Sequence, residues 1–151
     1  MRALTMQRTV SAETLDHLAP EDPAAQRSRR DLMRVHRAMR SCAIVARGWR
    51  ALWPARSLIG PLKILEIGAG DGTLLLAVAR SLAPQWPPVQ LTLLDRQDIV
   101  SAATLAGYAE LGWVVRVEVA DVLDWAVQPS AEMASGKSSP TWDLISTTLF
   151  L

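Results

Sequence analysis

Residues 63–73 read KILEIGAGDGT, and this stretch decides the fold. The run from Ile64 to Ile67 is apolar apart from Glu66, which is typical of a short strand buried on both faces. Residues 73–82 then carry the apolar pattern of a helix that packs on a sheet. Between the two, glycine occupies every second position, so the backbone can turn tightly and a ligand can approach it closely: Gly68, Gly70 and Gly72.

Several kinds of site use a glycine-rich turn between a strand and a helix. A dinucleotide site needs Gly-x-Gly-x-x-Gly or Ala, but Thr73 stands at the sixth position. A phosphate-binding loop ends in Gly-Lys-Ser or Gly-Lys-Thr, and that ending is absent from this stretch. The spacing Glu-x-Gly-x-Gly-x-Gly, from Glu66 to Gly72, resembles motif I of the class I S-adenosylmethionine-dependent methyltransferases. A tight turn that binds no ligand is the remaining alternative.

Two acids stand where further strands are expected to end. Residues 89–95 and 113–119 read as strands; Asp95 ends the first of them and Asp121 follows the second. In doubly wound folds, an acid at the tip of the second strand binds ribose. Asp95 is therefore expected to accept hydrogen bonds from both ribose hydroxyls, with a strand-end cap as the alternative.

The methyltransferase resemblance assigns a role to each part of this edge. It implies that Asp95 binds the ribose, that Arg96 stacks on the adenine, and that Asp121 and the Val122 N–H bind the adenine edge. The methionine portion would lie against Glu66 and the backbone of Gly68, Ala69, Gly70 and Gly72. The implied cofactor is S-adenosylmethionine, and the implied reaction transfers its methyl group to a small molecule that is polyketide-, quinone- or phenol-like. No catalytic base is assigned; Thr147 and Thr148 are candidates for contact with the acceptor.

The resemblance extends over about residues 62–151. Class I methyltransferases have seven strands in the order 3-2-1-4-5-7-6, and this chain supplies the first four, so we expect it to be incomplete at its C-terminus. The arginine-rich segment that ends in Gly48-Trp49-Arg50 and the closing residues 146–151 are also similar to a bacterial subgroup of ubiquinone/menaquinone-biosynthesis type. The competing hypothesis is a non-catalytic S-adenosylmethionine-binding or interaction module. In that case the exposed fourth strand, residues 144–151, would pair with another chain.

The predicted fold class is α/β, a Rossmann-like doubly wound parallel sheet with an N-terminal helical extension. We divide the chain into a helical extension, residues 1–57, and a cofactor-binding domain, residues 58–151. The extension is expected to hold a short helix over residues 12–18 and a long one from Ala24 to about Trp53, with a break near Gly48. We interpret it as a lid or as part of the acceptor side.

Charge is distributed unevenly along the chain. Residues 1–56 hold 11 arginines and 5 acids, and residues 57–151 hold 5 basic and 10 acidic residues. The basic segment could meet nucleic acid, an anionic surface or an acidic substrate, although a solvated helix face is the simpler interpretation. Nucleic acid is not the expected partner, because the Asn/Asp-Pro-Pro-aromatic motif of base-amino methylation does not follow the fourth strand.

The remaining composition excludes several classes of protein. With one cysteine, Cys42, the chain cannot form an internal disulfide, and with two histidines it has no zinc signature. No apolar run approaches the roughly 20 residues of a membrane span. The N-terminus lacks the apolar core of a signal peptide, so the expected location is the cytoplasm.

Overall fold

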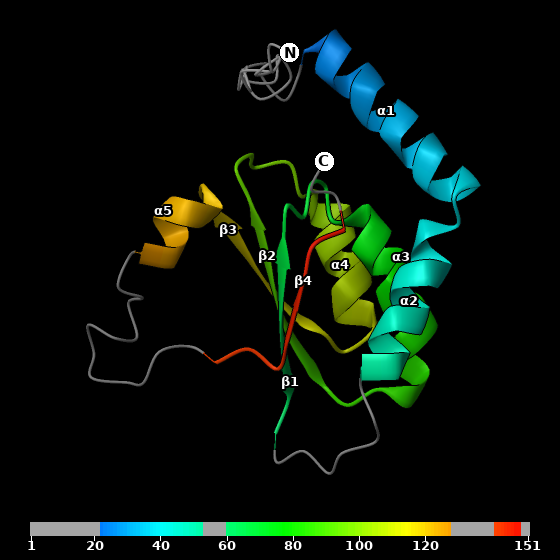
Figure 1. Ribbon diagram of the computed structural model, residues 1–151, viewed down its shortest axis with the longest axis vertical. Coiled ribbons are helices and arrows are strands. Elements are labelled where there is room, and N and C mark those ends of the chain that lie inside the picture. The colour runs from blue at the N-terminus through cyan, green and yellow to red at the C-terminus, as the bar shows by residue number, and fades with distance from the viewer. Residues whose placement is uncertain (1–21, 53–59, 128–140, 149–151) are drawn as a thin grey trace, which may run out of the picture.

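The computed structural model describes residues 22–52, 60–127 and 141–148 (Figure 1). Its helices are α1 (Pro23–Ala38), α2 (Ser41–Leu52), α3 (Thr73–Leu82), α4 (Ala102–Glu110) and α5 (Val122–Val127), with a 3-10 turn, η2 (Ala83–Gln85). Its strands are β1 (Leu62–Ile67), β2 (Val89–Asp95), β3 (Val114–Val119) and β4 (Leu144–Ser146). The predicted short helix over residues 12–18 and Trp53 lie outside the described residues.

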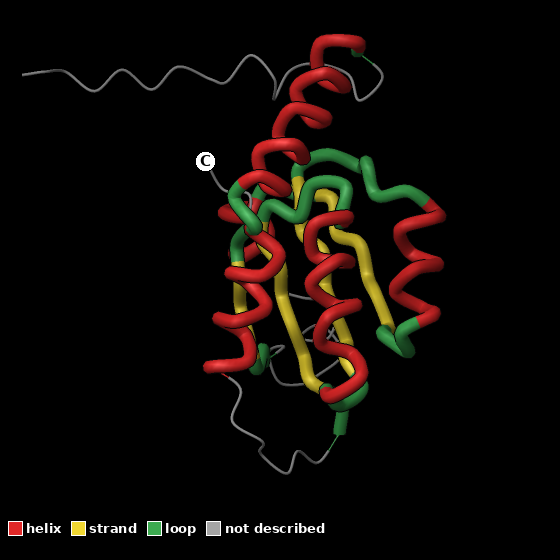
Figure 2. Tube along the Cα trace, turned by 90° about the vertical axis from the view of Figure 1, so that its right-hand side faces the viewer, coloured by secondary structure: helices red, strands yellow, loops and turns green. Residues whose placement is uncertain are grey.

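The four strands form one parallel sheet in the order β3-β2-β1-β4. This confirms the predicted α/β, Rossmann-like architecture preceded by N-terminal helices. Figures 1 and 2 show α2, α3 and α4 together on one side of the strands. Because all strands are parallel, the loops after β1, β2 and β3 meet at one edge of the sheet, where the predicted site residues lie.

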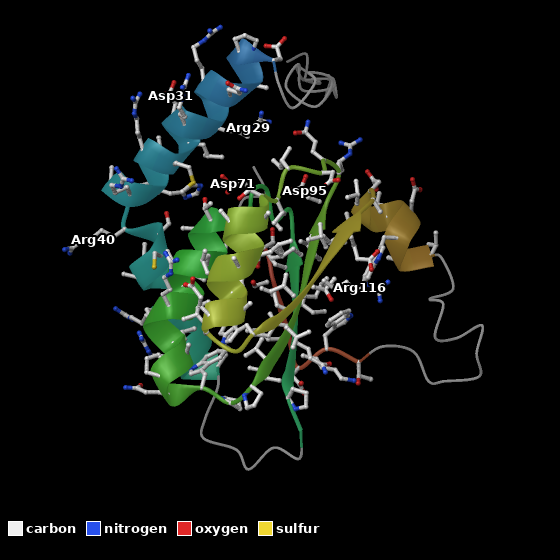
Figure 3. All side chains as sticks on the ribbon, turned by 180° about the vertical axis from the view of Figure 1, so that it is seen from behind. Arg29, Asp31, Arg40, Asp71, Asp95 and Arg116 are labelled. Carbon is white, nitrogen blue, oxygen red and sulfur yellow. The ribbon has the colours of Figure 1, made fainter. Side chains whose placement is uncertain are left out.

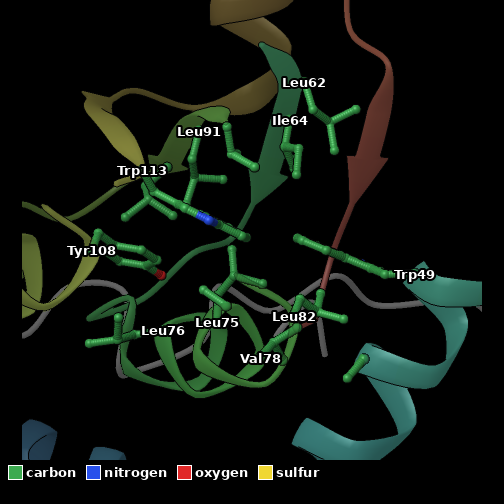
Figure 4. Packing of buried hydrophobic residues seen from close by; sticks show 14 of the residues in the cluster. Trp49, Leu62, Ile64, Leu75, Leu76, Val78, Leu82, Leu91, Tyr108 and Trp113 are labelled. Carbon is green, nitrogen blue, oxygen red and sulfur yellow. The ribbon is translucent and has the colours of Figure 1, made fainter. Parts of the chain in front are cut away.

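The main core lies between the sheet and these three helices (Figure 4). Strand residues such as Leu62, Ile64 and Leu91 are at most 1% exposed and pack on apolar side chains of α3. A row of stacked aromatic rings packs at the core. The ring centroids are 5.7 Å apart for Trp49–Trp86, 6.5 Å for Trp86–Trp113 and 6.2 Å for Tyr108–Trp113. Trp49 therefore belongs to the core, since its side chain is buried.

The predicted N-terminal helix is in fact two helices, and its break was placed wrongly. Helix α2 runs through Gly48, whereas the chain turns at Met39 and Arg40. Arg40 takes a left-handed φ of 55°, and the Arg40 N–H bonds the Arg37 carbonyl at 3.2 Å. The His36 Nδ1 and the Ser41 hydroxyl, 3.0 Å apart, join the two sides of this corner. Glycine is therefore not what breaks the helix here.

The ends of other elements have local causes. Helix α4 begins at Ala102, where the Ser101 hydroxyl accepts the Thr104 N–H at 3.1 Å. A short helix, α5, follows β3 and Asp121. The fourth strand was predicted over residues 144–151, but in the described part of this segment it covers Leu144–Ser146, and residues 149–151 lie outside that part.

Within the described ranges, no helix combines the length and the apolar character that a transmembrane segment requires.

Candidate functional site

The glycine-rich loop lies where β1 ends and α3 begins. Gly68, Gly70 and Gly72 all have positive φ, between 57° and 73°, as the predicted tight turn requires. At Gly72 a side chain is also excluded by neighbours, because a Cβ atom would lie 3.2 Å from Leu93 Cδ1 and 3.3 Å from Thr104 Cγ2. The sequence motif therefore marks a real backbone requirement.

Most of the N–H groups of this loop already have acceptors within the chain. The Leu94 carbonyl accepts from Gly68 at 2.9 Å and from Ala69 at 3.1 Å. The Gly70 N–H donates to the Asp95 carboxylate, and the Gly72 N–H donates to the Ala69 carbonyl. The Thr73 N–H donates to the Asp71 carboxylate. A phosphate cradle needs such groups free and pointing at the ligand. This loop instead has the carboxylates of Asp71 and Asp95 beside it, each of which accepts one of its N–H groups.

Asp95 at the end of β2 supports the loop directly. One carboxylate oxygen accepts the Gly70 N–H at 2.8 Å, and the other accepts the Gln97 N–H at 3.0 Å. The carboxylate has about four lone-pair sites, so two bonds leave room for hydroxyl donors of a ligand. The structure thus brings Asp95 and the glycine loop together, as predicted, and adds a local role for Asp95 in shaping the loop.

Arg96 and Asp121 meet across the ends of β2 and β3. The Arg96 Nε lies 3.4 Å from an Asp121 carboxylate oxygen. The other Asp121 oxygen accepts the Leu123 N–H at 2.8 Å. This carboxylate therefore caps the N-terminus of α5, whose first residue is Val122. The two predicted adenine-end residues are therefore paired with each other.

The carboxyl group of Glu66 contacts the segment at the end of β4 rather than the glycine-rich loop. Its carboxyl group is buried and receives the Ser146 hydroxyl, the Thr148 hydroxyl and, at 2.9 Å, the Thr148 N–H. Burial raises the pKa of this carboxyl, while the bonds from Ser146 and Thr148 lower it in part. A ligand contact at Glu66 stays a prediction, because the hydrogen bonds of this carboxyl with described residues come from Ser146 at the end of β4 and from Thr148 just after it.

Helix α1 stands over the same edge of the sheet (Figure 3). The Met33 sulfur lies 3.6 Å from the Thr73 hydroxyl, and the Arg29 guanidinium lies 3.4 Å from the Gln97 side-chain oxygen. In Figure 3, Asp71 and Asp95 lie near each other with Arg29 above them. Helix α1 thus lies beside the start of α3 and the end of β2, while its role as a lid or as part of the acceptor side stays a prediction.

Sequence reasoning missed four residues that shape the site. Asp71 accepts the N–H and the hydroxyl of Thr73, and an acid two residues before a helix-starting Thr is the signal that could have revealed it. Nothing in the sequence pairs Ser146 with Glu66, Met33 with Thr73, or Tyr108 with Gly72, because each pair is joined only by the tertiary fold.

Within the described residues, neither a metal-ligand cluster nor a surface depression forms part of this site. The described residues contain no group of three His, Cys, Asp or Glu side chains placed to hold a metal ion. An open depression of about 540 Å³, lined by Pro61, Pro87, Pro88 and Gly112 among others, lies at the amino ends of the strands. It is at the opposite end of the sheet from the glycine loop and is not part of this site.

The fold and the site together define a Rossmann-like α/β domain whose sheet has an acidic, glycine-rich carboxyl edge. No protein-family model matches the sequence, and a search of curated proteins finds no match. The functional argument therefore rests on the geometry of this edge.

Proposed function

We propose that this chain binds S-adenosylmethionine at the carboxyl edge of its sheet and is the cofactor-binding part of a small-molecule methyltransferase. The observation that carries the proposal is the state of the glycine loop. Its N–H groups are largely used within the chain, while Asp71 and Asp95 face the same edge. Such a surface favours a ligand that is positively charged and rich in hydroxyl donors over a pyrophosphate.

S-adenosylmethionine has these properties. Its sulfonium and ammonium groups are cations, and its ribose carries two hydroxyl donors. Asp95 keeps lone pairs for the ribose, and the Arg96–Asp121 pair borders the place where the adenine would lie. An arginine held by a carboxylate presents a flat guanidinium, which suits stacking on a base.

The reaction would be an in-line displacement. An oxygen, carbon or nitrogen of the acceptor gives an electron pair to the methyl carbon, and the carbon–sulfur bond breaks with its electrons left on a neutral thioether. Holding donor and acceptor collinear under α1 supplies much of the rate. Asp143 takes no part, because it bonds the Lys63 N–H at 2.8 Å at the start of β1, away from the ligand edge.

The second candidate is a non-catalytic S-adenosylmethionine-binding or interaction module. It is favoured by β4, which lies at the edge of the described sheet and whose Ile145 is 57% exposed. Such an edge strand can pair with another chain. Turnover separates the two candidates: a binding module retains the cofactor but transfers no methyl group to any of a panel of phenols, quinols and polyketides.

Calorimetry with S-adenosylmethionine, its demethylated product and NAD tests the binding step. We expect S-adenosylmethionine to bind and NAD not to bind, and Asp95→Ala to weaken binding at least about tenfold, because a charged acceptor is lost. The matched control is Asp143→Ala, which removes an acid that also accepts a backbone N–H but lies at the other end of the sheet. A folded protein that binds NAD, or neither ligand, contradicts the proposal.

A further inference from the structure

We propose that Tyr108 is a positioning residue for the ligand loop: its hydroxyl holds the Gly72 carbonyl and thereby fixes the last turn of the loop. The proposal rests on the proposed function, since it concerns the same loop. It gives helix α4, which carries none of the predicted ligand contacts, a role in binding.

The hydrogen bond between Tyr108 and Gly72 lies in the buried interior. The Tyr108 hydroxyl donates to the Gly72 carbonyl at 2.9 Å, and the residue is 0% exposed. Burial, with the nearby negative charges of Glu66 and Asp71, raises the pKa of the phenol, so it stays protonated and remains a donor. Because water does not readily reach the buried Gly72 carbonyl, losing the Tyr108 donor costs free energy.

The accepting carbonyl lies at the junction of loop and helix. It also receives the Leu76 N–H at 3.0 Å, the first hydrogen bond of α3, while the Gly72 N–H bonds the Ala69 carbonyl at 3.1 Å. One residue, Gly72, therefore links the turn of the loop, the start of α3 and the Tyr108 side chain. If the Tyr108 hydroxyl is lost, the Gly72 carbonyl, which accepts the first hydrogen bond of α3, loses its side-chain donor.

The ring of Tyr108 has little freedom to leave this position. It stacks on Trp113, and Figure 4 shows these two side chains in the core. The Trp113 ring stacks on Trp86, which in turn stacks on Trp49 of α2. On the same helix, Gly107 permits close contact with α3, because a Cβ atom there would lie 2.8 Å from Leu76 Cδ2. Packing on both sides thus keeps the hydroxyl aimed at Gly72.

The hydroxyl points at backbone and not at the open edge, so Tyr108 acts through the loop. Gly70, two residues before Gly72, is the residue that Asp95 holds by its N–H. A shift at Gly72 therefore changes the separation of loop and Asp95, between which the ribose and methionine parts of the ligand would bind. We infer that loss of the hydroxyl weakens ligand binding by more than it weakens folding in general.

Tyr108→Phe tests this inference because it removes one hydroxyl and keeps the ring. The matched control is Ser81→Ala, which also removes a hydroxyl that donates to a backbone carbonyl, that of Val78 at 2.8 Å, but at the far end of α3. We expect Tyr108→Phe to weaken binding of S-adenosylmethionine about fivefold by calorimetry. Ser81→Ala should leave the dissociation constant within about twofold of wild type, because Ser81 lies at the other end of α3 from the loop.

Hydrogen exchange of the ligand-free protein provides a second readout that does not depend on the cofactor. Residues 70–76 should exchange faster in Tyr108→Phe, and their exchange in Ser81→Ala should match wild type. Equal effects of the two variants on binding, or unchanged exchange in this segment, overturn the positioning role. If wild type binds no S-adenosylmethionine, the proposed function fails, while the exchange experiment still decides whether Tyr108 fixes the loop.

Discussion

The carboxyl group of Glu66 on β1 accepts the Thr148 N–H at 2.9 Å, which ties together residues 82 positions apart in the chain. Ser146, on β4, donates to the same carboxyl. Strand β4 has only three residues in register with β1, so its backbone pairing is short. Glu66 therefore holds the end of this edge strand by side-chain bonds as well as standing in the ligand motif.

Removing this carboxyl is expected to cost stability. Glu66→Ala leaves the Thr148 N–H and two hydroxyls without their acceptor in a buried place, and we expect a loss of about 1–3 kcal/mol in the free energy of unfolding. Urea unfolding of wild type and variant measures the loss. The control is Glu118→Ala at the opposite edge strand, β3, where Glu118 pairs with the largely exposed Arg116. A similar cost in both variants would contradict a special role for Glu66.

The pH dependence of stability should carry a contribution from Glu66. Because burial raises its folded pKa above the unfolded value of about 4.3, the folded state binds this proton more tightly. The resulting stabilisation is complete below the unfolded pKa and is lost as pH rises through the folded pKa. Glu66→Gln cannot ionise, so its stability relative to wild type should increase as pH rises from about 4 to about 7. A constant difference across that range would disprove the raised pKa.

The sequence predicted the parts of the fold that depend on local pattern. The apolar runs and the glycine spacing gave α3 and β2 with the bounds that the structure shows, Thr73–Leu82 and Val89–Asp95. Strand ends in a parallel sheet meet at one edge, so the approach of Asp95 to the loop at Gly70 also followed from pattern alone.

Pattern could not predict contacts that depend on which surfaces meet. Met33 reaches Thr73 only because the chain turns at Arg40, a residue with no intrinsic preference for a left-handed φ. Glu66 carries the motif spacing of a ligand residue, yet its bonds go to Ser146 and Thr148 because parallel pairing of β1 with β4 brings them beside it. Local periodicity contains no information on either event.

Gly72 and Gly112 offer a comparison between backbone strain and crowding. Their φ values are nearly equal, 73° and 74°, but a Cβ atom at Gly72 would meet Leu93 and Thr104, whereas nothing lies within 4 Å at Gly112. We expect Gly112→Ala to cost about 1–2 kcal/mol for the left-handed conformation alone, and Gly72→Ala to cost more. Thermal and urea unfolding provide the comparison, and equal costs would show that the neighbours of Gly72 yield without strain.

The aromatic row makes α2 part of the core, although most of that helix is exposed. Trp49 is 3% exposed and stacks on Trp86, whereas Ile44 on the same helix is 64% exposed. Trp49→Ala should therefore reduce the free energy of unfolding by about 3–5 kcal/mol, and Ile44→Ala by no more than about 0.5 kcal/mol. Urea unfolding followed by circular dichroism measures both. A small loss for Trp49→Ala would mean that α2 does not depend on this contact.

Helix α1 is expected to open more readily than the helices on the sheet, because Ala25 is its one buried residue within the described part of the chain. At the carboxyl edge of the sheet, the Met33 sulfur lies 3.6 Å from the Thr73 hydroxyl, and the Arg29 guanidinium lies 3.4 Å from the Gln97 side-chain oxygen. Hydrogen exchange should therefore be faster in residues 23–38 than in α3, and Met33→Ala should accelerate it further. Arg34→Ala is the control, since its ion pair with Asp31 is exposed and contributes little. Added S-adenosylmethionine should slow exchange in α1 if this helix closes over the ligand, and protection equal to that of α3 in the free protein would show that α1 is a fixed part of the fold and not a lid.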